Sequence, residues 1–383
     1  MRILIIRSFP SYMNVKNNTY NIQEVGLAKA LVRRGLNCDI LFWTNKEDAD
    51  VVLQVDSNST VTVFYRRGIT MLKNTFFTGV KALFAKYDIL QPNEYNQIQA
   101  WYLSRKYPQK TIIYHGPYYS SFNKRYNLMC KVFDVFFLRS YLKRNTKFIA
   151  KSEMAKTFLS NKGISSNNIS VVGVGIDTQM LTSLNVVCNE PLYLQMNKDQ
   201  DKLKILYVGR FEKRRNIHFI LDVFGKVLAM RPDARLYLIG SGDPAYLQSV
   251  FDYIDTLNIR ENVVWQERME QRFLSKVYSC ADFFILPAEY EIFGMVLLEA
   301  MYYRTIVLTT LNGGSGTLIQ NAQNGYVFKT KDINTWVERL LKTAENQTAM
   351  QEIKDAAYKT VAELFTWDCL AQRFICQYKM ICS

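Results

Sequence analysis

The chain has 383 residues, of which 49% are hydrophobic and 21% charged, as in a globular protein with more than one hydrophobic core. No segment has the roughly 18 consecutive apolar residues that a membrane-spanning helix requires. The seven cysteines include no C-x-x-C pair, so the sequence indicates a reducing cytosol and predicts no metal cluster.

The net charge of +14 lies entirely in the first half of the chain. Residues 1–180 hold 25 Lys or Arg against 11 Asp or Glu, whereas residues 181–383 hold 23 of each. A basic field confined to one half implies an anionic partner for that half, such as a membrane surface, a nucleic acid or an acidic polymer.

The first half begins with a strand–helix–strand unit. Residues 2–7, with an apolar run of only four residues, predict a strand buried on both faces rather than a signal peptide. Residues 22–32 carry apolar side chains at helical spacing and are followed by a helix stop at residues 33–35. Residues 39–43 predict the next strand. This order opens a doubly wound parallel domain.

Two segments between later strands of the first half combine basic and aromatic residues. Residues 65–87 contain five basic residues and no acid, and residues 118–148 contain seven basic residues, nine aromatics and one acid, Asp134. Two ordinary helices with solvated basic faces would explain this composition. We favour a basic amphipathic surface that docks on anionic lipid headgroups.

Regular periodicity fades over residues 183–203, which therefore predict a linker. Strands and helices alternate again over residues 204–365, and a last helix, residues 366–383, could return to the first domain, which covers residues 1–182. The sequence thus predicts the α/β class, with two successive Rossmann-like, doubly wound domains.

The stretch 281–301 is the most informative part of the second half. It predicts a short apolar strand, a loop that carries Glu291, and a helix that begins near Gly294 and carries Glu299. The first-turn amides of a helix have no intrahelical partner, and the helix dipole is positive at that end. Such an arrangement favours an anionic ligand, for example a phosphate.

A second loop, residues 208–216, follows another predicted strand and contains four cations in six positions. Loops at the carboxyl ends of parallel strands bind ligands in doubly wound folds. A solvated cationic loop is the simpler interpretation. We favour a diphosphate clamp, because an Arg side chain can bind a phosphate through two N–H groups at once.

These residues resemble family 4 of the retaining glycosyltransferases, which have the GT-B fold. The likeness covers nearly all of residues 204–330 and is looser in the first half, where residues 22–31 and 175–177 match. The loop 8–21 lacks the glycine pair usual in the family. The motifs that carry the likeness are Gly209-Arg210 followed by cations, Gly240-x-Gly242, the pair Glu291-x7-Glu299 with Phe293-Gly294 between them, Asn312-Gly313-Gly314 and Asn324-Gly325.

The resemblance implies roles for the two carboxylates and the cations. Glu299 would hold the ribose hydroxyls of the nucleotide, and Glu291 would meet a hydroxyl of the donor sugar. Arg210 matches the phosphate-binding arginine of the family, and Arg215 falls on the usual lysine. His115, at the end of a predicted strand in the first half, matches the region of a histidine that contacts the donor sugar.

Backbone amides near the start of the 294–301 helix would cap the phosphate and the sugar, and two further residues complete the predicted nucleotide contacts. No metal and no cofactor are expected, because the donor itself, linked to UDP or GDP, is a substrate. The predicted capping residues are Phe293, Gly294, Met295 and Val296, and the two further residues are Gly209 and Arg268.

Residues 48–50 and 199–201 are Asp-x-Asp triplets. Such triplets bind metal–nucleotide complexes in another glycosyltransferase fold, which would argue against a metal-independent enzyme. Both lie in predicted loops and neither recurs in a metal-like cluster. We therefore expect all four carboxylates to be solvated.

The sequence predicts a hexosyltransferase at the inner face of the cell membrane, acting in polysaccharide biosynthesis. Its donor would be a nucleotide sugar, its acceptor a lipid-linked glycan or an oligosaccharide, and its basic first half would contact the anionic membrane surface. A nucleotide-sugar epimerase on the same fold is one alternative. A basic protein that binds nucleic acid or membrane without catalysis is another, but no nucleic-acid-binding module is recognisable, so we expect no nucleic-acid partner.

Overall fold

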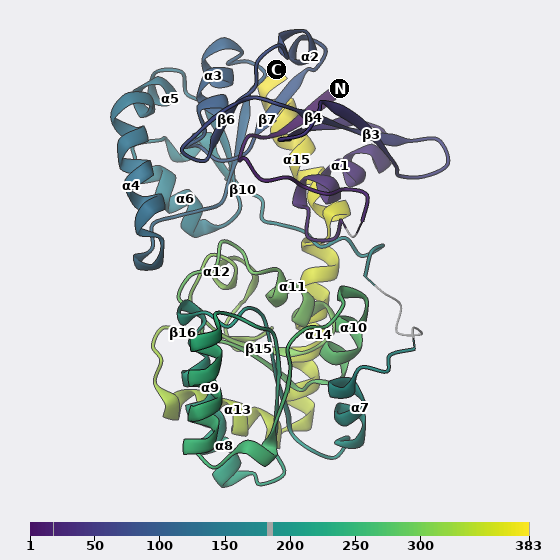
Figure 1. Cartoon of the computed structure of the whole chain (residues 1–383), viewed down its shortest axis with the longest axis vertical. Coiled ribbons are helices and arrows are strands. Elements are labelled where there is room, and N and C mark those ends of the chain that lie inside the picture. Colours follow the sequence, from purple (N-terminus) through teal and green to yellow (C-terminus); the bar gives the residue numbers. More distant parts are fainter. Residues whose placement is uncertain (18, 182–186, 383) are drawn as a thin grey trace. The chain divides into compact units, whose positions relative to one another are not determined.

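The structure, a computed structural model, describes residues 1–17, 19–181 and 187–382, which form two compact units (Figure 1). Unit 1 holds Met1–Asp177 together with Phe365–Ser383, and unit 2 holds Thr178–Leu364. Both units consist of largely parallel strands with helices packed on them. The predicted α/β class with two Rossmann-like domains is confirmed.

Unit 1 contains a sheet of order β3-β4-β2-β1-β7 and a sheet of order β10-β9-β8, with parallel bridges between residue pairs 90/111 and 93/114. Only β3 pairs antiparallel within the described parts of these two sheets. Residues 3–6 are fully buried, as in a parallel sheet covered on both faces. The strands are β1 (Arg2–Arg7), β2 (Asn37–Trp43), β3 (Ala49–Gln54), β4 (Thr60–Arg66), β5 (Ile69–Met71), β6 (Asn74–Phe76), β7 (Ile89–Pro92), β8 (Ile112–His115), β9 (Lys147–Ala150) and β10 (Ile169–Val171).

The C-terminal helix α15 (Trp367–Cys382) is part of unit 1, where it lies beside α1 (Gln23–Arg33) (Figure 1). Trp367 is 1% exposed, and a Cβ on Gly26 of α1 would lie 2.3 Å from its indole Nε1. Arg33 donates to both carboxylate oxygens of Asp368, at 2.8 and 3.1 Å. The remaining helices of unit 1 are α2 (Lys81–Ala85), α3 (Ile98–Lys106), η1 (Ser121–Asn123), α4 (Lys124–Phe133), η2 (Asp134–Leu138), α5 (Arg139–Lys143), α6 (Glu153–Ser160) and η3 (Ser166–Asn168).

The segment 65–87 differs from the helical connection that its composition suggested. It holds the end of β4, the antiparallel hairpin β5–β6 and the five-residue helix α2. Residues 69–71 are all exposed, so the apolar residues of this segment do not form the buried face of a single helix. The segment 118–148, in contrast, is helical over Ser121–Lys143, through η1, α4, η2 and α5.

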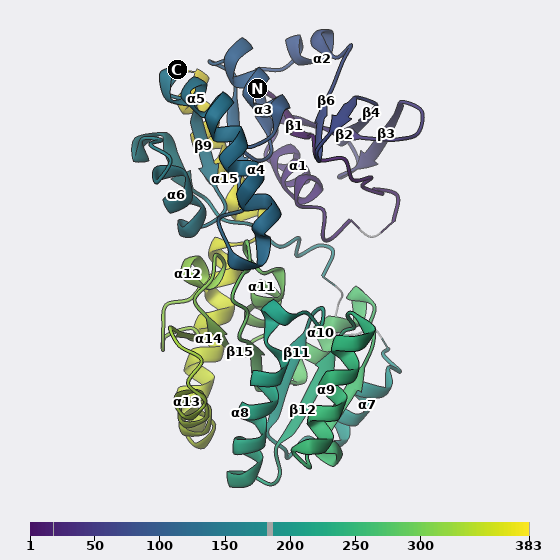
Figure 2. The same ribbon diagram turned by 60° about the vertical axis from the view of Figure 1, so that its left-hand side comes forward.

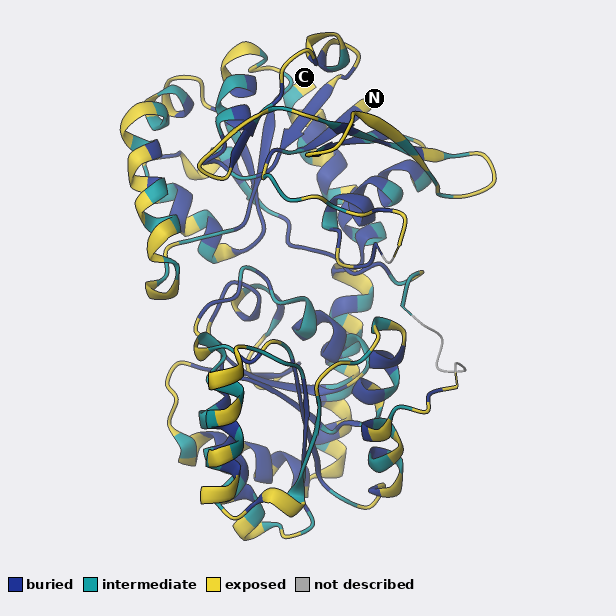
Figure 3. Cartoon of the chain, in the orientation of Figure 1, coloured by how far each residue is buried: buried dark blue, intermediate teal, exposed yellow. Residues whose placement is uncertain are grey.

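Unit 2 is built on one six-stranded sheet of order β13-β12-β11-β14-β15-β16, in which every described pair is parallel. The reversal of strand order puts β11 next to β14, so the loops that follow these two strands are neighbours. Both strands are fully buried (Figure 3). The strands are β11 (Lys204–Val208), β12 (Arg235–Ile239), β13 (Val263–Gln266), β14 (Phe283–Leu286), β15 (Ile306–Thr310) and β16 (Tyr326–Phe328).

The helices of unit 2 pack in one continuous series, α9–α8–α13–α14–α11–α10–α7. Figure 2 shows α8 and α9 beside β11 and β12. The predicted linker 183–203 is partly wrong, since its residues Pro191–Lys198 form α7 on the edge strand β13; residues 183–186 lie outside the described residues. The helices are α7, η4 (Lys213–Arg215), α8 (Ile217–Met230), α9 (Pro244–Thr256), η5 (Arg260–Asn262), α10 (Gln271–Cys280), α11 (Met295–Tyr302), α12 (Ser315–Leu318), α13 (Ile333–Glu345) and α14 (Gln347–Leu364).

Candidate functional site

Glycines allow the loops that follow β11 and β12 to pack closely against each other. Gly209 has φ +151°, and a Cβ there would lie 2.6 Å from Nη1 of Arg215. A Cβ on Gly240 would lie 1.9 Å from the carbonyl oxygen of Gly209, and one on Gly242 would lie 2.0 Å from that of Phe211. The Gly-x-Gly pair after β12 therefore lets two loop backbones run in contact, whereas Gly209 leaves room for a guanidinium.

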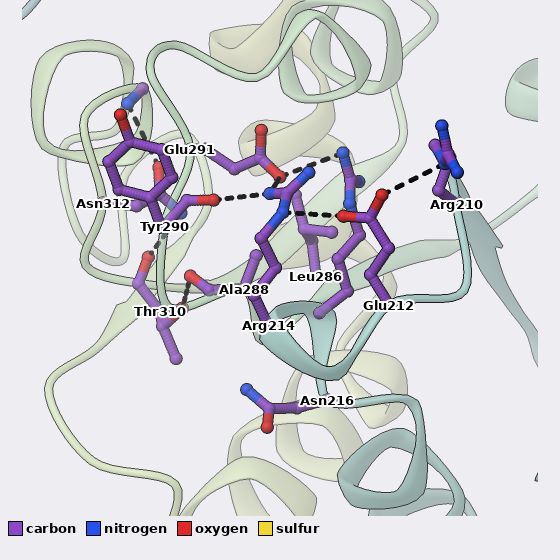
Figure 4. Close-up of polar contacts among 12 residues, drawn as sticks. Arg210, Glu212, Arg214, Asn216, Leu286, Ala288, Tyr290, Glu291, Thr310 and Asn312 are labelled. Carbon is purple, nitrogen blue, oxygen red and sulfur yellow. Dashed lines mark hydrogen bonds and ion pairs between the residues drawn. The ribbon is translucent and has the colours of Figure 1, made fainter. Parts of the chain in front are cut away.

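Arg210, the predicted phosphate ligand, extends into solvent. Its side chain is 76% exposed, and its Nε lies 3.1 Å from Oε1 of Glu212 (Figure 4). An exposed guanidinium that is held by one carboxylate is free to change partner at little cost, because such surface pairs contribute at most about 1 kcal/mol. This position suits a side chain that closes on an incoming anion.

Arg214, which the sequence analysis did not select as a site residue, joins the two loops. Its Nη1 donates to Oε1 of Glu291 at 2.8 Å and to the carbonyl oxygen of Tyr290 at 2.6 Å, and its Nε donates to Glu212 at 2.8 Å (Figure 4). Burial alone would lower the pKa of Arg214, but the carboxylates of Glu291 and Glu212 raise it above its usual value. Arg214 therefore stays charged and clamps the loop that carries Glu291.

Arg215 lies deeper than its two neighbours. Its Nη2 is 3.0 Å from Oε1 of Glu291, and its Nε and Nη1 are buried and make no well-aligned hydrogen bond to any described residue, although the guanidinium interacts with the hydroxyl of Tyr207. Asn216, the next residue, adopts φ +52° and donates to the carbonyl oxygen of Pro287 at 2.9 Å. Asn tolerates this left-handed conformation better than most residues, so the turn forms without a glycine.

The loop after β14 is held in place from the other side by residues 312–315. A Cβ on Gly313 would lie 2.4 Å from the carbonyl oxygen of Ile292, and one on Gly314 would lie 1.5 Å from that of Phe293. Oδ1 of Asn312 accepts hydrogen bonds from the amides of Gly314 and Ser315. The predicted Asn-Gly-Gly motif thus supports the glutamate-bearing loop through close backbone packing.

Helix α11 begins as predicted, directly after Gly294, which has φ +78°. Phe293 is buried beneath this turn, and the first helical residues, Met295 and Val296, are half-buried. The first-turn amides of the helix belong to these residues and have no helical acceptor of their own. The turn therefore offers a positive helix end close to the loop that carries Glu291.

Glu299 lies in the second turn of α11 and is buried. Its carboxylate accepts hydrogen bonds from the hydroxyl of Tyr278 at 2.9 Å and from Nε2 of Gln271 at 3.4 Å, both on α10. These α10 residues carried no motif in the sequence. Arg268, between β13 and α10, is exposed, and its carbonyl oxygen accepts from Gln266 at 2.8 Å.

Both halves of the chain match family models of sugar-transferring enzymes. Residues 25–180 match "Glycosyltransferase Family 4" and residues 194–360 match "Glycosyl transferases group 1". The chain belongs to the glycosyltransferases.

An uncharacterized glycosyltransferase of Methanocaldococcus jannaschii is 34% identical over 187 residues, 48% of this chain and 46% of that protein. An uncharacterized 41.2 kDa protein in the cps region of Klebsiella pneumoniae is 27% identical over 289 residues, 72% of this chain and 76% of that protein. For most of the first curated relatives, the match spans less than half of the relative's length.

The crystal structure of the Anabaena protein HepE in complex with UDP superposes with a TM-score of 0.73 at 14% identity, covering 99% of this chain and 100% of that one. At this identity the likeness shows the fold alone. The fold of this glycosyltransferase is therefore GT-B, as the sequence predicted.

His115 of this glycosyltransferase ends β8 in unit 1 and is completely buried. Its Nδ1 lies 2.8 Å from Oε2 of Glu94, and its Nε2 has no hydrogen-bond partner among the described residues. Burial would raise the pKa of Glu94, but Lys151, His115 and the amide of Gly116 lower it to about 2. The ends of three parallel strands thus bring together a histidine, a carboxylate and a lysine, of which the sequence analysis selected only the histidine.

The Asp-x-Asp triplets have structural partners. Asp50 pairs with Arg66 at 2.6 Å and Asp48 lies 3.7 Å from Arg67, both at the exposed end of the sheet in unit 1. The prediction that all four carboxylates are solvated was wrong for Asp199, which is buried and accepts from the hydroxyl of Tyr237 at 2.5 Å. Asp199 directly follows α7, which packs on β13 and α10 within unit 2, and for that reason the polar composition of this segment was misleading.

Among the residues that the structure describes, no three His, Cys, Asp or Glu side chains are grouped as metal ligands would be. No described helix combines the length and apolarity needed to cross a bilayer. Of the predicted site residues, unit 2 brings Arg215 into direct contact with Glu291, and Arg210 joins them through Glu212 and Arg214.

Proposed function

We propose that this glycosyltransferase is a retaining, metal-independent enzyme that moves a hexose-type sugar from a UDP- or GDP-linked donor to a hydroxyl of a lipid-linked glycan. The observation that carries the donor site is the guanidinium of Arg215, whose Nε and Nη1 are buried and make no well-aligned hydrogen bond to a described residue, with only the Tyr207 hydroxyl nearby. Glu291 already pairs with the charge, but each buried N–H that lacks a good acceptor costs about 1–3 kcal/mol, and an anion would remove that cost. The diphosphate of a nucleotide sugar is such an anion, and HepE, which shares the fold, binds UDP.

The proposed chemistry needs charge stabilisation more than proton transfer by the protein. The bond between the sugar carbon and the diphosphate oxygen breaks, and the leaving diphosphate gains negative charge. Arg210, Arg215 and the first turn of α11 would stabilise this charge. The acceptor hydroxyl would attack from the face that the diphosphate leaves and give its proton to the departing phosphate oxygen, as the resemblance to family 4 suggests. Glu291 and Glu299 would accept hydrogen bonds from the sugar and ribose hydroxyls.

The acceptor and the place of action are proposed from charge and from one relative. The excess positive charge lies in residues 1–180, nearly all of unit 1, and favours an anionic acceptor or surface there. The Klebsiella relative is a protein of the cps region. We therefore place the enzyme at the inner face of the cell membrane, in the synthesis of cell-surface polysaccharide.

Titration calorimetry with UDP and GDP in the presence of a chelator tests the donor site. Arg215→Ala should raise the dissociation constant at least about tenfold, because a charge-assisted hydrogen bond contributes roughly 1.5–3 kcal/mol. Arg260→Ala, which removes an exposed arginine from the same unit, is the control. Wild-type affinity in Arg215→Ala would overturn the assignment. Release of free nucleotide from UDP-sugars or GDP-sugars only when an acceptor is added separates transfer from epimerisation.

A further inference from the structure

The helical stretch 124–143 of unit 1 turns large apolar side chains toward solvent. Val135 is 78% exposed, Phe136 71% and Leu128 62%, and cations occupy the positions between them. We call this surface the outer helical face. It consists of Leu128, Val132, Val135, Phe136 and Leu142 together with Lys124, Arg125, Lys131, Arg139 and Lys143, all of them exposed.

The one acid in this stretch, Asp134, does not belong to the outer helical face. Its carboxylate pairs with Lys162 and accepts from the hydroxyl of Tyr95 at 3.2 Å, both on the inner side. All the charge that the stretch presents outward is therefore positive. The sequence shows five cations and one acid in residues 124–143, but only the structure shows that the acid side chain is turned inward.

The inner side of the same stretch is already filled. Phe133 and Tyr141 are buried in the core of unit 1, and Phe137 packs on Trp101 of α3 with ring centroids 4.8 Å apart. Residues 134–138 form a π-helical turn, whose longer period keeps positions 133, 137 and 141 on the inner side. Val135 and Phe136 are thus held outward by a packed inner side.

A second feature of unit 1 has the same chemistry. The hairpin β5–β6 turns at Leu72 and Lys73, with φ of 49° and 61°, and its residues Ile69, Met71 and Leu72 are each more than 60% exposed. A turn of this kind favours Gly or Asn, and a leucine there costs of order 1 kcal/mol without any packing in return. Phe76 of this hairpin contacts Tyr102 of α3, the helix on which Phe137 also packs.

We infer that the outer helical face docks on an anionic lipid bilayer, with Val135 and Phe136 inserted among the headgroups and the flanking cations bound to lipid phosphates. This inference rests on the membrane partner of the proposed function and names the surface that meets it. The alternation of cations with large apolar groups, without any acid, is what an interfacial helix requires.

Other occupants fit this face less well. A nucleic acid would pair with the cations but would gain nothing from Val135, Phe136 and Leu128 beside its charged backbone. A second copy of the chain would bring the same cations face to face, so that the positive charges would repel. A bilayer with anionic headgroups satisfies both kinds of side chain at once.

Flotation of the full chain with phosphatidylcholine vesicles, with and without phosphatidylglycerol, tests the inference. Wild type should bind only the anionic vesicles, and Val135→Ser/Phe136→Ser should weaken this binding at least about tenfold, because two apolar side chains lose their insertion. The matched control is Val52→Ser/Met230→Ser, which removes two apolar side chains elsewhere that are 61% and 66% exposed. Lys131→Ser/Arg139→Ser should also weaken binding and reduce its salt dependence.

The inference would be overturned if Val135→Ser/Phe136→Ser bound vesicles as the wild type does. It would also be overturned if the wild-type protein were retained on DNA but not on vesicles at the same salt concentration. Concentration-dependent self-association of the wild type that this variant abolishes would be a third contradicting result. UDP binding and the melting temperature of each variant separate the two proposals. A variant that loses vesicle binding but still binds UDP identifies a defect in the docking face and not in the donor site. Vesicle binding without any binding of UDP or GDP would leave the docking face standing and remove the proposed donor site.

Discussion

The contrast between Arg210 and Arg214 separates a ligand-binding arginine from a structural one, although the two lie only four residues apart. Arg210→Ala removes a side chain that is 76% exposed and holds one carboxylate, so unfolding should become easier by less than about 1 kcal/mol. Arg214→Ala removes hydrogen bonds to Glu291, Glu212 and the carbonyl oxygen of Tyr290. Because Arg215 still holds Glu291 in this variant, we expect the free energy of unfolding to fall by only roughly 2–4 kcal/mol.

Thermal unfolding and calorimetry with UDP measure the two effects separately. Arg214→Ala should lower the melting temperature of unit 2 by roughly 5–15 °C, and Arg210→Ala by less than about 4 °C. Arg210→Ala should nevertheless bind UDP about ten to a hundred times more weakly, because a phosphate contact is lost. Arg214→Lys keeps the charge but cannot reach three acceptors, so its melting temperature should be intermediate.

Two results would refute this reasoning. If Arg210→Ala binds UDP and GDP as the wild type does, Arg210 does not close on the diphosphate, and its likeness to the family arginine is misleading. If Arg214→Ala unfolds at the wild-type temperature, the clamp on Glu291 contributes nothing to unit 2, and the loop after β14 is held by residues 312–315 alone.

Two further predictions concern single residues of the two units. Lys151 and its neighbours lower the folded-state pKa of Glu94 to about 2. Glu94 should therefore contribute roughly 3 kcal/mol to the free energy of unfolding above about pH 4.5, and this contribution is lost as the pH falls toward 2. Urea unfolding of Glu94→Gln should show a deficit at pH 7 that shrinks below pH 4.5; a deficit independent of pH would contradict this. Gly209→Ala should lower the free energy of unfolding of unit 2 by at least about 2 kcal/mol and weaken UDP binding, because the added methyl group displaces Arg215. Gly225→Ala is the control, since its methyl group would meet no neighbouring atom. Equal melting temperatures of the two variants would contradict this prediction.

Much of the fold could be predicted because its signals are local. Buried apolar runs such as residues 3–6 and 283–286 specify parallel strands, and a glycine at position 294 marks the start of a helix. The pair Glu291 and Glu299 could be selected for the same reason, since both lie within one strand–loop–helix segment. Segment 65–87 misled the prediction because its apolar residues serve a hairpin, a short helix and an exposed turn in succession.

The sequence by itself therefore determined the two α/β domains, the cationic loop after β11 and the glutamate-bearing loop after β14. Only the tertiary structure decided that β11 and β14 are neighbours in the sheet, which brings Arg214 to Glu291 across 77 residues of chain. Hydrophobic periodicity specifies which face of an element is buried, but strand order follows from how whole helices and sheets pack. For that reason the clamp at Glu291 was not visible in the residue pattern, and neither was the inward turn of Asp134, which leaves the outer helical face with positive charge alone.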